Sequence, residues 1–295
     1  MKLREWVAFC FLGTVWGSSF LWIKIGLSEI KPFTLIAYSF LLGAIGLLVI
    51  MRLTKQSFPR DRNTYLGYLF MAVFNAAVPF ALTSWGETKI SSGLAAILNA
   101  TVPLFTIVIA HFWLHDEKIN LSRIAGLTIG MFGIIILVSR DFNSGGGMQG
   151  QLALLLAAAS YGTAITFSRK HLRGKSPVVE AMMMILMADV VLWPLAFVVE
   201  GPLTVPLQIM TWTSIMVLGV VGSSLAYVLY FYLIETRGAV RASLVNYVYP
   251  VVGLILGVSL LGEVAHWELI VGSLLIVVGI TIINTTGRTL IRNRL

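Results

Sequence analysis

Residues 92–106 read SGLAAILNATVPLFT, and in this apolar stretch Asn99 stands four residues before Pro103. The same spacing recurs at Asn246 and Pro250, 147 residues further along the chain (99 to 246). A proline removes one helical hydrogen bond, and its ring crowds the carbonyl of the residue four positions back. In lipid, freed backbone groups are tolerated only where protein or a water-filled cavity satisfies them. The paired pattern therefore indicates an internal duplication and predicts where a ligand binds.

The composition is that of an integral membrane protein. Hydrophobic residues make up 58% of the chain, charged residues 12%, and the mean hydropathy is +0.89. Soluble domains carry about twice this charged fraction, so a soluble chain of 295 residues could not cover its surface. The single cysteine, Cys10, excludes a disulfide within one chain, and the Cys and His spacing of metal sites is missing. We expect neither a metal nor a cofactor.

Ten apolar segments of about 20 residues, the length that crosses a bilayer, follow one another along the chain. They lie near residues 6–25, 32–51, 65–85, 92–114, 121–139, 151–168, 178–199, 212–234, 240–261 and 267–286. The sequence therefore predicts an all-α membrane protein with ten transmembrane helices.

Lysine and arginine are distributed unevenly over the connecting loops. If the N-terminus is cytoplasmic, 17 of the 21 basic residues fall in inner segments, leaving Lys24, Lys31, Lys89 and Arg140 outside. Because cytoplasmic loops carry the excess of positive charge, we expect an inner-membrane protein with both termini in the cytoplasm. The net charge of +8 is spread over short loops, which argues against nucleic acid as a partner.

The two halves of the chain match at an offset of about 145–147 residues. The matching pairs are Trp16-Gly17-Ser18 with Tyr161-Gly162-Thr163, Asn99 and Pro103 with Asn246 and Pro250, and Gly126 and Gly133 with Gly272 and Gly279. Each half holds five segments, an odd number, so the halves cross the membrane in opposite senses. Inverted repeats with sites at broken helices are typical of many secondary transporters. We place the first repeat at 1–142 and the second at 148–287, joined by the Gly/Ser-rich linker 143–147.

Several of these motifs resemble one family. Residues 92–106, Leu114-His115-Asp116-Glu117 and the glycines at 126 and 133 resemble the EamA-type repeat of the drug/metabolite transporter superfamily. Residues 16–20, WGSSF, resemble its opening signature, and Asn246 to Gly279 resemble the repeat more loosely. The resemblance implies two inverted five-helix repeats around a central cavity that opens alternately to either side. Where the family often carries an arginine-aromatic pair, this chain has Ser39-Phe40, so no role of that arginine is transferred.

The candidate substrate-binding residues are polar or aromatic. The set is Trp16, Ser19, Asn75, Phe80, Trp85, Asn99, Tyr161, Thr163, Tyr227, Tyr230 and Asn246, with Trp22, Tyr247 and Tyr249 as further aromatic candidates. Aromatic walls with a few polar groups are usual in small-molecule sites and suit a neutral or zwitterionic metabolite. For the two asparagines the alternative is hydrogen bonding between helices, worth about 1 kcal/mol. The small polar side chains equally fit packing or a bond to the backbone. Pro103 and Pro250 are assigned to bending or gating.

Asp189 stands in the middle of the seventh segment. A carboxylate within the membrane is costly and is usually functional, so proton coupling is one interpretation. A protonated or hydrogen-bonded structural aspartate is the other. Glu117 and Glu263 lie at opposite membrane faces under the inversion, and we expect them to cap helix starts.

These observations predict a secondary transporter that moves a small organic solute, such as an amino acid, a related metabolite or a toxic compound. By the resemblance it works by alternating access and is an exporter. A channel-like or substrate-sensing membrane protein on the same scaffold is the alternative. An enzyme is not expected, because Arg173-Gly174-Lys175-Ser176 lacks the first glycine of a phosphate-binding loop and no other catalytic motif is found. The expected partners are the solute and the lipid bilayer, and the expected state is a monomer or weak homodimer.

Overall fold

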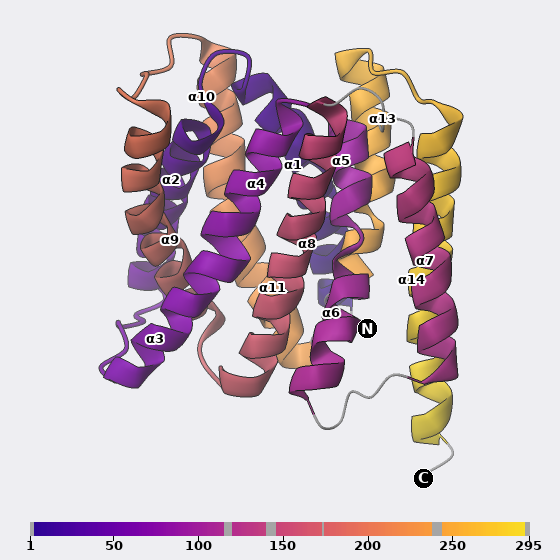
Figure 1. Ribbon diagram of the computed structural model, residues 1–295. Coiled ribbons are helices and arrows are strands. Elements are labelled where there is room, and N and C mark those ends of the chain that lie inside the picture. The colour runs from indigo at the N-terminus through magenta and orange to yellow at the C-terminus, as the bar shows by residue number, and fades with distance from the viewer. Residues whose placement is uncertain (1–2, 115–119, 140–145, 173, 238–243, 293–295) are drawn as a thin grey trace.

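The computed structural model describes residues 3–114, 120–139, 146–172, 174–237 and 244–292, and every regular element in these ranges is a helix (Figure 1). The first half contains α1 (Leu3–Gly26), α2 (Pro32–Leu53), α3 (Arg62–Met71), the π-helix η1 (Ala72–Ala77), α4 (Val78–Glu87), α5 (Ser92–Asn99), α6 (Val102–Trp113) and α7 (Leu121–Ser139). The second half contains α8 (Gly146–His171), α9 (Pro177–Glu200), α10 (Ile209–Met216), the π-helix η2 (Val217–Leu225), α11 (Ala226–Arg237), the 3-10 helix η3 (Leu244–Tyr247), α13 (Tyr249–Leu261) and α14 (Trp267–Arg292).

Some predictions fall outside the described residues. These are the two chain ends at residues 1–2 and 293–295, Glu117, Arg140, the repeat boundary at 142 and the part of the linker at 143–145. Gly146 and Gly147, the remainder of the predicted linker, belong to the first turn of α8.

Seven helical stretches are long and apolar enough to cross a membrane. They are Trp6–Gly26, Pro32–Leu53, Thr64–Glu87, Ser92–Trp113, Gly147–His171, Pro177–Glu200 and Ile209–Leu233. Three shorter apolar helices cover Leu121–Leu137, Tyr249–Leu261 and Trp267–Gly279. The prediction of an all-α membrane protein is thus confirmed in the described part of the chain.

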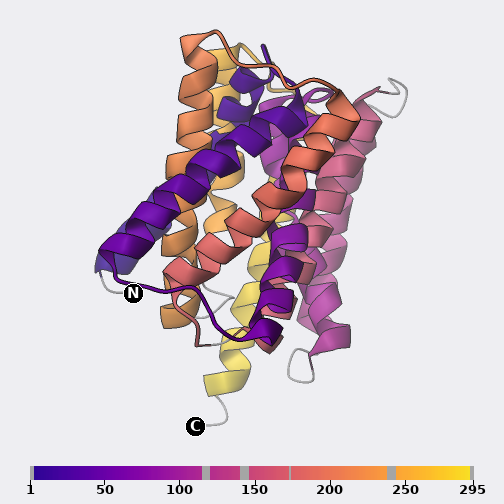
Figure 2. The same ribbon diagram turned by 90° about the vertical axis from the view of Figure 1, so that its left-hand side faces the viewer.

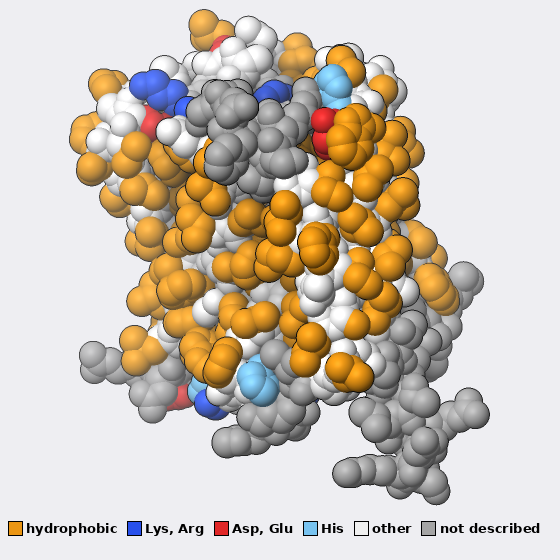
Figure 3. Space-filling model, turned by 45° about the vertical axis from the view of Figure 1, so that its right-hand side comes forward, with side chains coloured by type: hydrophobic (Ala, Val, Ile, Leu, Met, Phe, Trp, Pro, Cys, Tyr) orange, Lys and Arg blue, Asp and Glu red, His pale blue; other side chains and the backbone are white. Residues whose placement is uncertain are grey.

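The surface of the bundle fits a lipid environment. On the face in Figure 3, hydrophobic side chains cover the middle, and charged and histidine side chains gather toward the two ends. Many large apolar side chains are exposed, Phe112, Phe132 and Leu156 among them, and such extensive apolar exposure is favourable where the surrounding medium is apolar.

The two halves of the chain pack into one another. α7 lies along α14, α5 along α13, and α4 and α6 along α8. α2 packs on α9, and both run obliquely across the face seen in Figure 2. At the α7–α14 contact, a Cβ added to Gly133 would lie 2.7 Å from the carbonyl oxygen of Gly272, and one added to Gly279 would lie 2.7 Å from the nitrogen of Gly130. These glycines therefore permit the close approach of α7 and α14, as small residues do at contacts between membrane helices.

Candidate functional site

The two Asn-x-x-x-Pro motifs lie at interruptions between helices. α5 ends at Asn99 and α6 begins at Val102, with Pro103 in its first turn. Likewise η3 ends at Tyr247 and α13 begins at Tyr249, with Pro250 in its first turn. Proline costs no hydrogen bond in a first helical turn, because the N–H there has no intrahelical partner. The motifs therefore mark helix breaks, one within each of the predicted segments 92–114 and 240–261.

The π-helical segments η1 and η2 begin at equivalent positions, residues 72 and 217. Their backbone carbonyls accept hydrogen bonds from side chains of the opposite half. Trp16 Nε1 donates to Gly222 O at 3.0 Å, and the Tyr227 hydroxyl donates to Asn75 O at 3.3 Å. Ser160 Oγ donates to Phe74 O at 2.7 Å. π-Helical stretches within α-helices are frequent at functional sites, and here they join the two halves.

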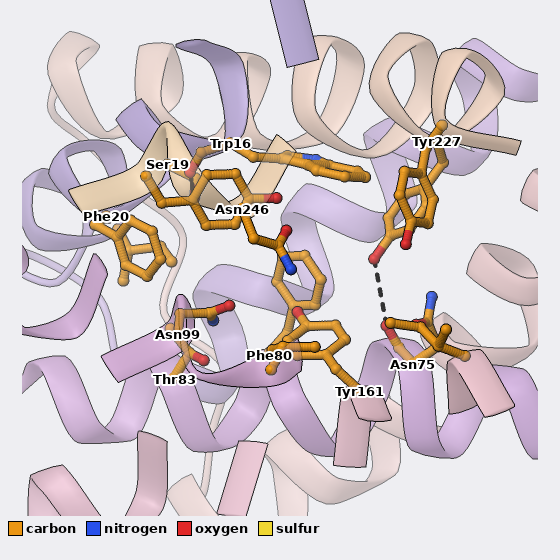
Figure 4. A pocket seen from close by; sticks show the side chains of 15 residues that line it. Trp16, Ser19, Phe20, Asn75, Phe80, Thr83, Asn99, Tyr161, Tyr227 and Asn246 are labelled. Carbon is orange, nitrogen blue, oxygen red and sulfur yellow. Dashed lines mark hydrogen bonds between the residues drawn. The ribbon is translucent and has the colours of Figure 1, made fainter. Parts of the chain in front are cut away.

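A cavity lies at the two helix breaks, next to η1 and α11, with about 620 Å³ of empty volume including its opening. Nine of the eleven predicted residues line it: Trp16, Ser19, Asn75, Phe80, Asn99, Tyr161, Tyr227, Tyr230 and Asn246. Tyr249, from the wider aromatic set, also lines it. Figure 4 shows Asn99 and Asn246 extending into the same space from opposite sides. The structure thus brings most of the candidates together, although solute binding by them stays a prediction.

Two predicted residues lie outside the cavity lining, because they are on the other faces of their helices. Trp85 is two residues from Thr83, which does line the cavity, and the Lys89 ammonium lies 5.3 Å from its ring centroid. Thr163 lies midway between Tyr161 and Ile165, and its hydroxyl donates to Ala159 O at 2.9 Å. Residues two apart on a helix point in nearly opposite directions. Trp22 likewise lies outside the lining.

Five lining residues were not predicted: Phe20, Ile23, Thr83, Val102 and Ile165. Helical spacing would have found four of them. Phe20 and Ile23 are four and seven residues after Trp16, Thr83 is three after Phe80, and Ile165 is four after Tyr161. Residues three, four and seven apart share a helix face. The helical spacing that identifies these neighbours was therefore already present in the sequence, around correctly chosen aromatic residues.

The cavity is aromatic, polar and uncharged. The Trp16 ring contacts those of Tyr227 and Tyr230 edge-on, with centroids 5.3 and 5.0 Å apart, and that of Tyr249 at 6.5 Å. Asn99 and Asn246 are each 7% exposed. Among the described lining residues none is Lys, Arg, His, Asp or Glu. The site therefore offers π faces, hydroxyls and two amides, and it holds no counter-ion for a strongly charged solute.

Asp189 lies apart from this site. It is on α9, 6% exposed, with one carboxyl oxygen, Oδ1, buried without a hydrogen-bond partner. It does not belong to the described cavity lining. Its assignment to proton coupling stays a prediction.

Three glutamates cap helix starts of the opposite half at one end of the bundle. Glu263 accepts hydrogen bonds from the amides of Ser92 and Gly93 at 2.7 and 3.0 Å, at the start of α5. Glu200 accepts from the amides of Phe33 and Thr34 at the start of α2. The expectation that Glu263 caps a helix is therefore met, by a helix of the other half.

The third of these glutamates, Glu29, accepts from the amides of Leu207 and Gln208, just before α10. The nearby Thr211 side chain and then the Leu207 amide lower the pKa of Glu29 below its ordinary value. Carboxylates at helix starts are stabilised by the free amides and by the helix dipole.

The helical fold, the apolar surface and the cavity between two repeated halves define an integral membrane protein with an uncharged central cavity. The EamA-like transporter family matches residues 4–139 and 148–285. The chain therefore belongs to the EamA-like transporter family.

Relatives along most of the chain carry transporter names. The uncharacterized inner membrane transporter YedA of Escherichia coli K12 is 30% identical, over 84% of this chain and 80% of its own length. The uncharacterized transporter YoaV of Bacillus subtilis is 25% identical, over 90% of this chain and 91% of its own. A solved crystal structure superposes with a TM-score of 0.71 at 18% identity, covering 98% of this chain and 99% of that one. The last similarity concerns the fold alone.

Proposed function

We propose that the protein is a secondary transporter that moves a small organic solute across the inner membrane by alternating access. One observation carries this proposal: the uncharged aromatic cavity is lined from both halves, at the two helix breaks. Binding sites at discontinuous helices between inverted repeats are a general feature of secondary transporters. Movement of one half against the other would then open the cavity to one side at a time.

We further propose ten transmembrane segments arranged as two inverted five-helix repeats. Lys24, near the end of α1, bonds to the carbonyl of Glu87, and Gly86 contacts Gly150 near the start of α8. The first helix of one half thus ends where the first helix of the other begins, which supports opposite orientations. The basic loops favour cytoplasmic termini, and the family resemblance favours export.

For the solute we propose an amino acid, a related metabolite or a toxic compound, neutral or zwitterionic overall. The amides of Asn99 and Asn246 would bind its polar groups, and the rings around Trp16 its apolar part. Pro103 and Pro250 would allow the broken helices to bend, and Asp189 remains a candidate for proton coupling. We propose a monomer or weak homodimer in the bilayer.

Counterflow in proteoliposomes tests this function. Vesicles loaded with unlabelled amino acids, and then with other metabolites, receive a trace of the labelled compound outside. A transporter gives transient, saturable accumulation of label. The Asn99→Ala/Asn246→Ala double variant should abolish it, whereas Thr163→Val, outside the cavity, should not. A linear flux that excess solute does not compete with would contradict the proposal and favour a channel.

A further inference from the structure

A fully buried carboxyl group lies one helical turn from the cavity. Glu87, the last residue of α4, is 0% exposed, and both of its carboxyl oxygens are buried without a hydrogen-bond partner. Thr83, four residues earlier on the same helix face, lines the cavity, and its hydroxyl also lacks a partner. Glu87 therefore lies between the cavity and the end of the bundle where α4 ends.

The residues around Glu87 join several segments at this end of the cavity. Lys24 Nζ, one residue beyond the lining residue Ile23, donates to the backbone carbonyls of Glu87 and Ile90 at 2.6 and 2.7 Å. The Glu263 carboxylate is bound to the two amides at the start of α5. Ser92, at that same helix start, is 1% exposed, and its hydroxyl has no partner. This polar layer, Lys24, Glu87, Ser92 and Glu263, joins α1, α4 and α5 to the loop after α13.

The Glu87 carboxyl group interacts electrostatically with two charged side chains of this layer. They are Lys24 from α1 and Glu263 from the α13–α14 connection. The other charged groups nearby are engaged elsewhere. Lys31 Nζ donates to Glu200 O at 2.7 Å, and Lys89 lies over the Trp85 ring. From α8, the segment next to Glu87 presents Gly150, Ala153 and Leu154 to Gly86.

The two charges oppose each other at Glu87, because Lys24 favours a carboxylate and Glu263 disfavours it. Neither supplies a hydrogen bond to the Glu87 carboxyl group. A buried carboxylate without hydrogen bonds is strongly unfavourable, whereas a neutral carboxylic acid costs much less. Opening this end of the cavity would admit water and allow the carboxylate to form. A proton that binds one conformation better than another shifts the equilibrium between them.

We propose that Glu87 binds a proton while this end of the cavity is closed and releases it when this end opens, so that the proton is the coupling ion. The proposal rests on the transporter function above. It assigns the coupling ion to a carboxyl group adjoining the cavity, and it is independent of any role of Asp189.

Infrared titration tests proton binding without any transported solute. The full-length protein in liposomes is titrated with acid and base, and the carbonyl stretch of protonated carboxyl groups is followed in H₂O and D₂O. Glu87→Gln should lose the intensity of one protonated carboxyl group, whereas the matched variant Glu200→Gln should keep it, because Glu200 accepts three hydrogen bonds. Unchanged intensity in Glu87→Gln would overturn the proposal. If Glu87→Gln does not fold, Glu87→Asp should shift the midpoint of this band, and Glu200→Asp should not.

Thiol labelling tests the link to opening. In a Cys10→Ser background, Ser19→Cys places one thiol on the cavity wall, and a membrane-impermeant maleimide is added to each side in turn. Ser28→Cys, in the exposed turn after α1, corrects for the pH dependence of thiol reactivity. From the side where α4 ends, corrected labelling should rise severalfold with pH, and addition of Glu87→Gln should keep it low at every pH. Equal pH dependence with and without Glu87→Gln would overturn the proposal.

The two proposals can fail separately. Absence of counterflow with both Glu87 results intact would contradict the transporter function, and with it the coupling, but not proton binding by Glu87. Counterflow with an unaltered infrared band in Glu87→Gln would contradict only the role of Glu87.

Discussion

The indole nitrogen of Trp16 donates a hydrogen bond of 3.0 Å to the backbone carbonyl of Gly222. Trp16 belongs to the first helix of the chain, and Gly222 to the π-helical segment of the second half. Tyr227 makes the reciprocal bond to Asn75 in the π-helical segment of the first half. Both donor side chains also line the cavity. A solute that contacts these rings therefore contacts the groups that hold the two halves together.

Trp16→Phe tests this relationship, since it keeps an aromatic ring and removes the indole N–H. Leaving the Gly222 carbonyl without its donor should lower the free energy of unfolding by about 1 kcal/mol, the net value of such a bond. Thermal unfolding in detergent measures this loss of stability. Trp85→Phe, outside the cavity, is the control and should change stability less. Equal effects of the two substitutions would contradict the structural role of the Trp16 bond.

Asn99→Ala and Asn246→Ala should each weaken solute binding. A hydrogen bond to the solute is worth about 1 kcal/mol, which corresponds to an affinity about fivefold weaker. Competition in counterflow measures the affinity. If both variants retain full affinity, the amides serve only the packing of helices.

Thr83→Val and Thr163→Val form a matched pair on opposite sides of the cavity boundary. The Thr83 hydroxyl lines the cavity without a partner, so its removal should leave stability unchanged or raise it by up to about 1 kcal/mol. The same change should weaken solute affinity severalfold, whereas Thr163→Val should leave affinity unchanged. Counterflow and thermal unfolding measure the two effects. If Thr163→Val weakened solute affinity and Thr83→Val did not, the residues that face the cavity from α8 or α4 would be wrongly assigned.

The cap formed by Glu29 should depend on pH. Its pKa is lowered by the Thr211 side chain and the Leu207 amide, so its stabilising effect is full above the ordinary value of 4.5 and is lost as pH falls through the lowered pKa. Protection of the Leu207 and Gln208 amides from hydrogen exchange, corrected for intrinsic rates, should therefore fall on acidification from about pH 6 to pH 3. Glu29→Gln should show weaker protection without this pH dependence. Identical profiles would exclude the carboxylate cap.

Asp189→Asn tests the other candidate for proton coupling. If Asp189 carries the proton, the variant should lose the pH dependence of solute accumulation while solute exchange continues, because exchange needs no net proton transfer. Accumulation driven by an imposed pH gradient measures proton-coupled transport, and counterflow measures solute exchange, so the comparison separates these two activities. An unchanged pH dependence would leave Asp189 a structural residue.

The sequence alone determined the features that depend on local composition and spacing. Long apolar runs predict membrane helices because only chains of low charge are stable in lipid. The repeated Asn99 and Asn246 located the two helix breaks, since proline cannot continue a helix hydrogen-bond pattern. Aromatic residues in the middle of a segment, such as Trp16 and Tyr161, were also correctly placed at the cavity. Their position along the span was the reason for choosing them.

The tertiary structure decided which side of each helix faces the cavity. Lipid and protein interior are both apolar, so a membrane helix carries apolar residues all around and its sequence marks the inner face only weakly. Trp85 and Thr163 were therefore predicted in the cavity but point away from it, while Thr83 points into it. Contacts between the halves, such as that of Glu263 with the start of α5, depend on segments far apart in the chain. The same holds for the burial of the Glu87 carboxyl group without a hydrogen-bond partner. Only packing brings such groups together, because no local pattern specifies a neighbour more than a hundred residues away.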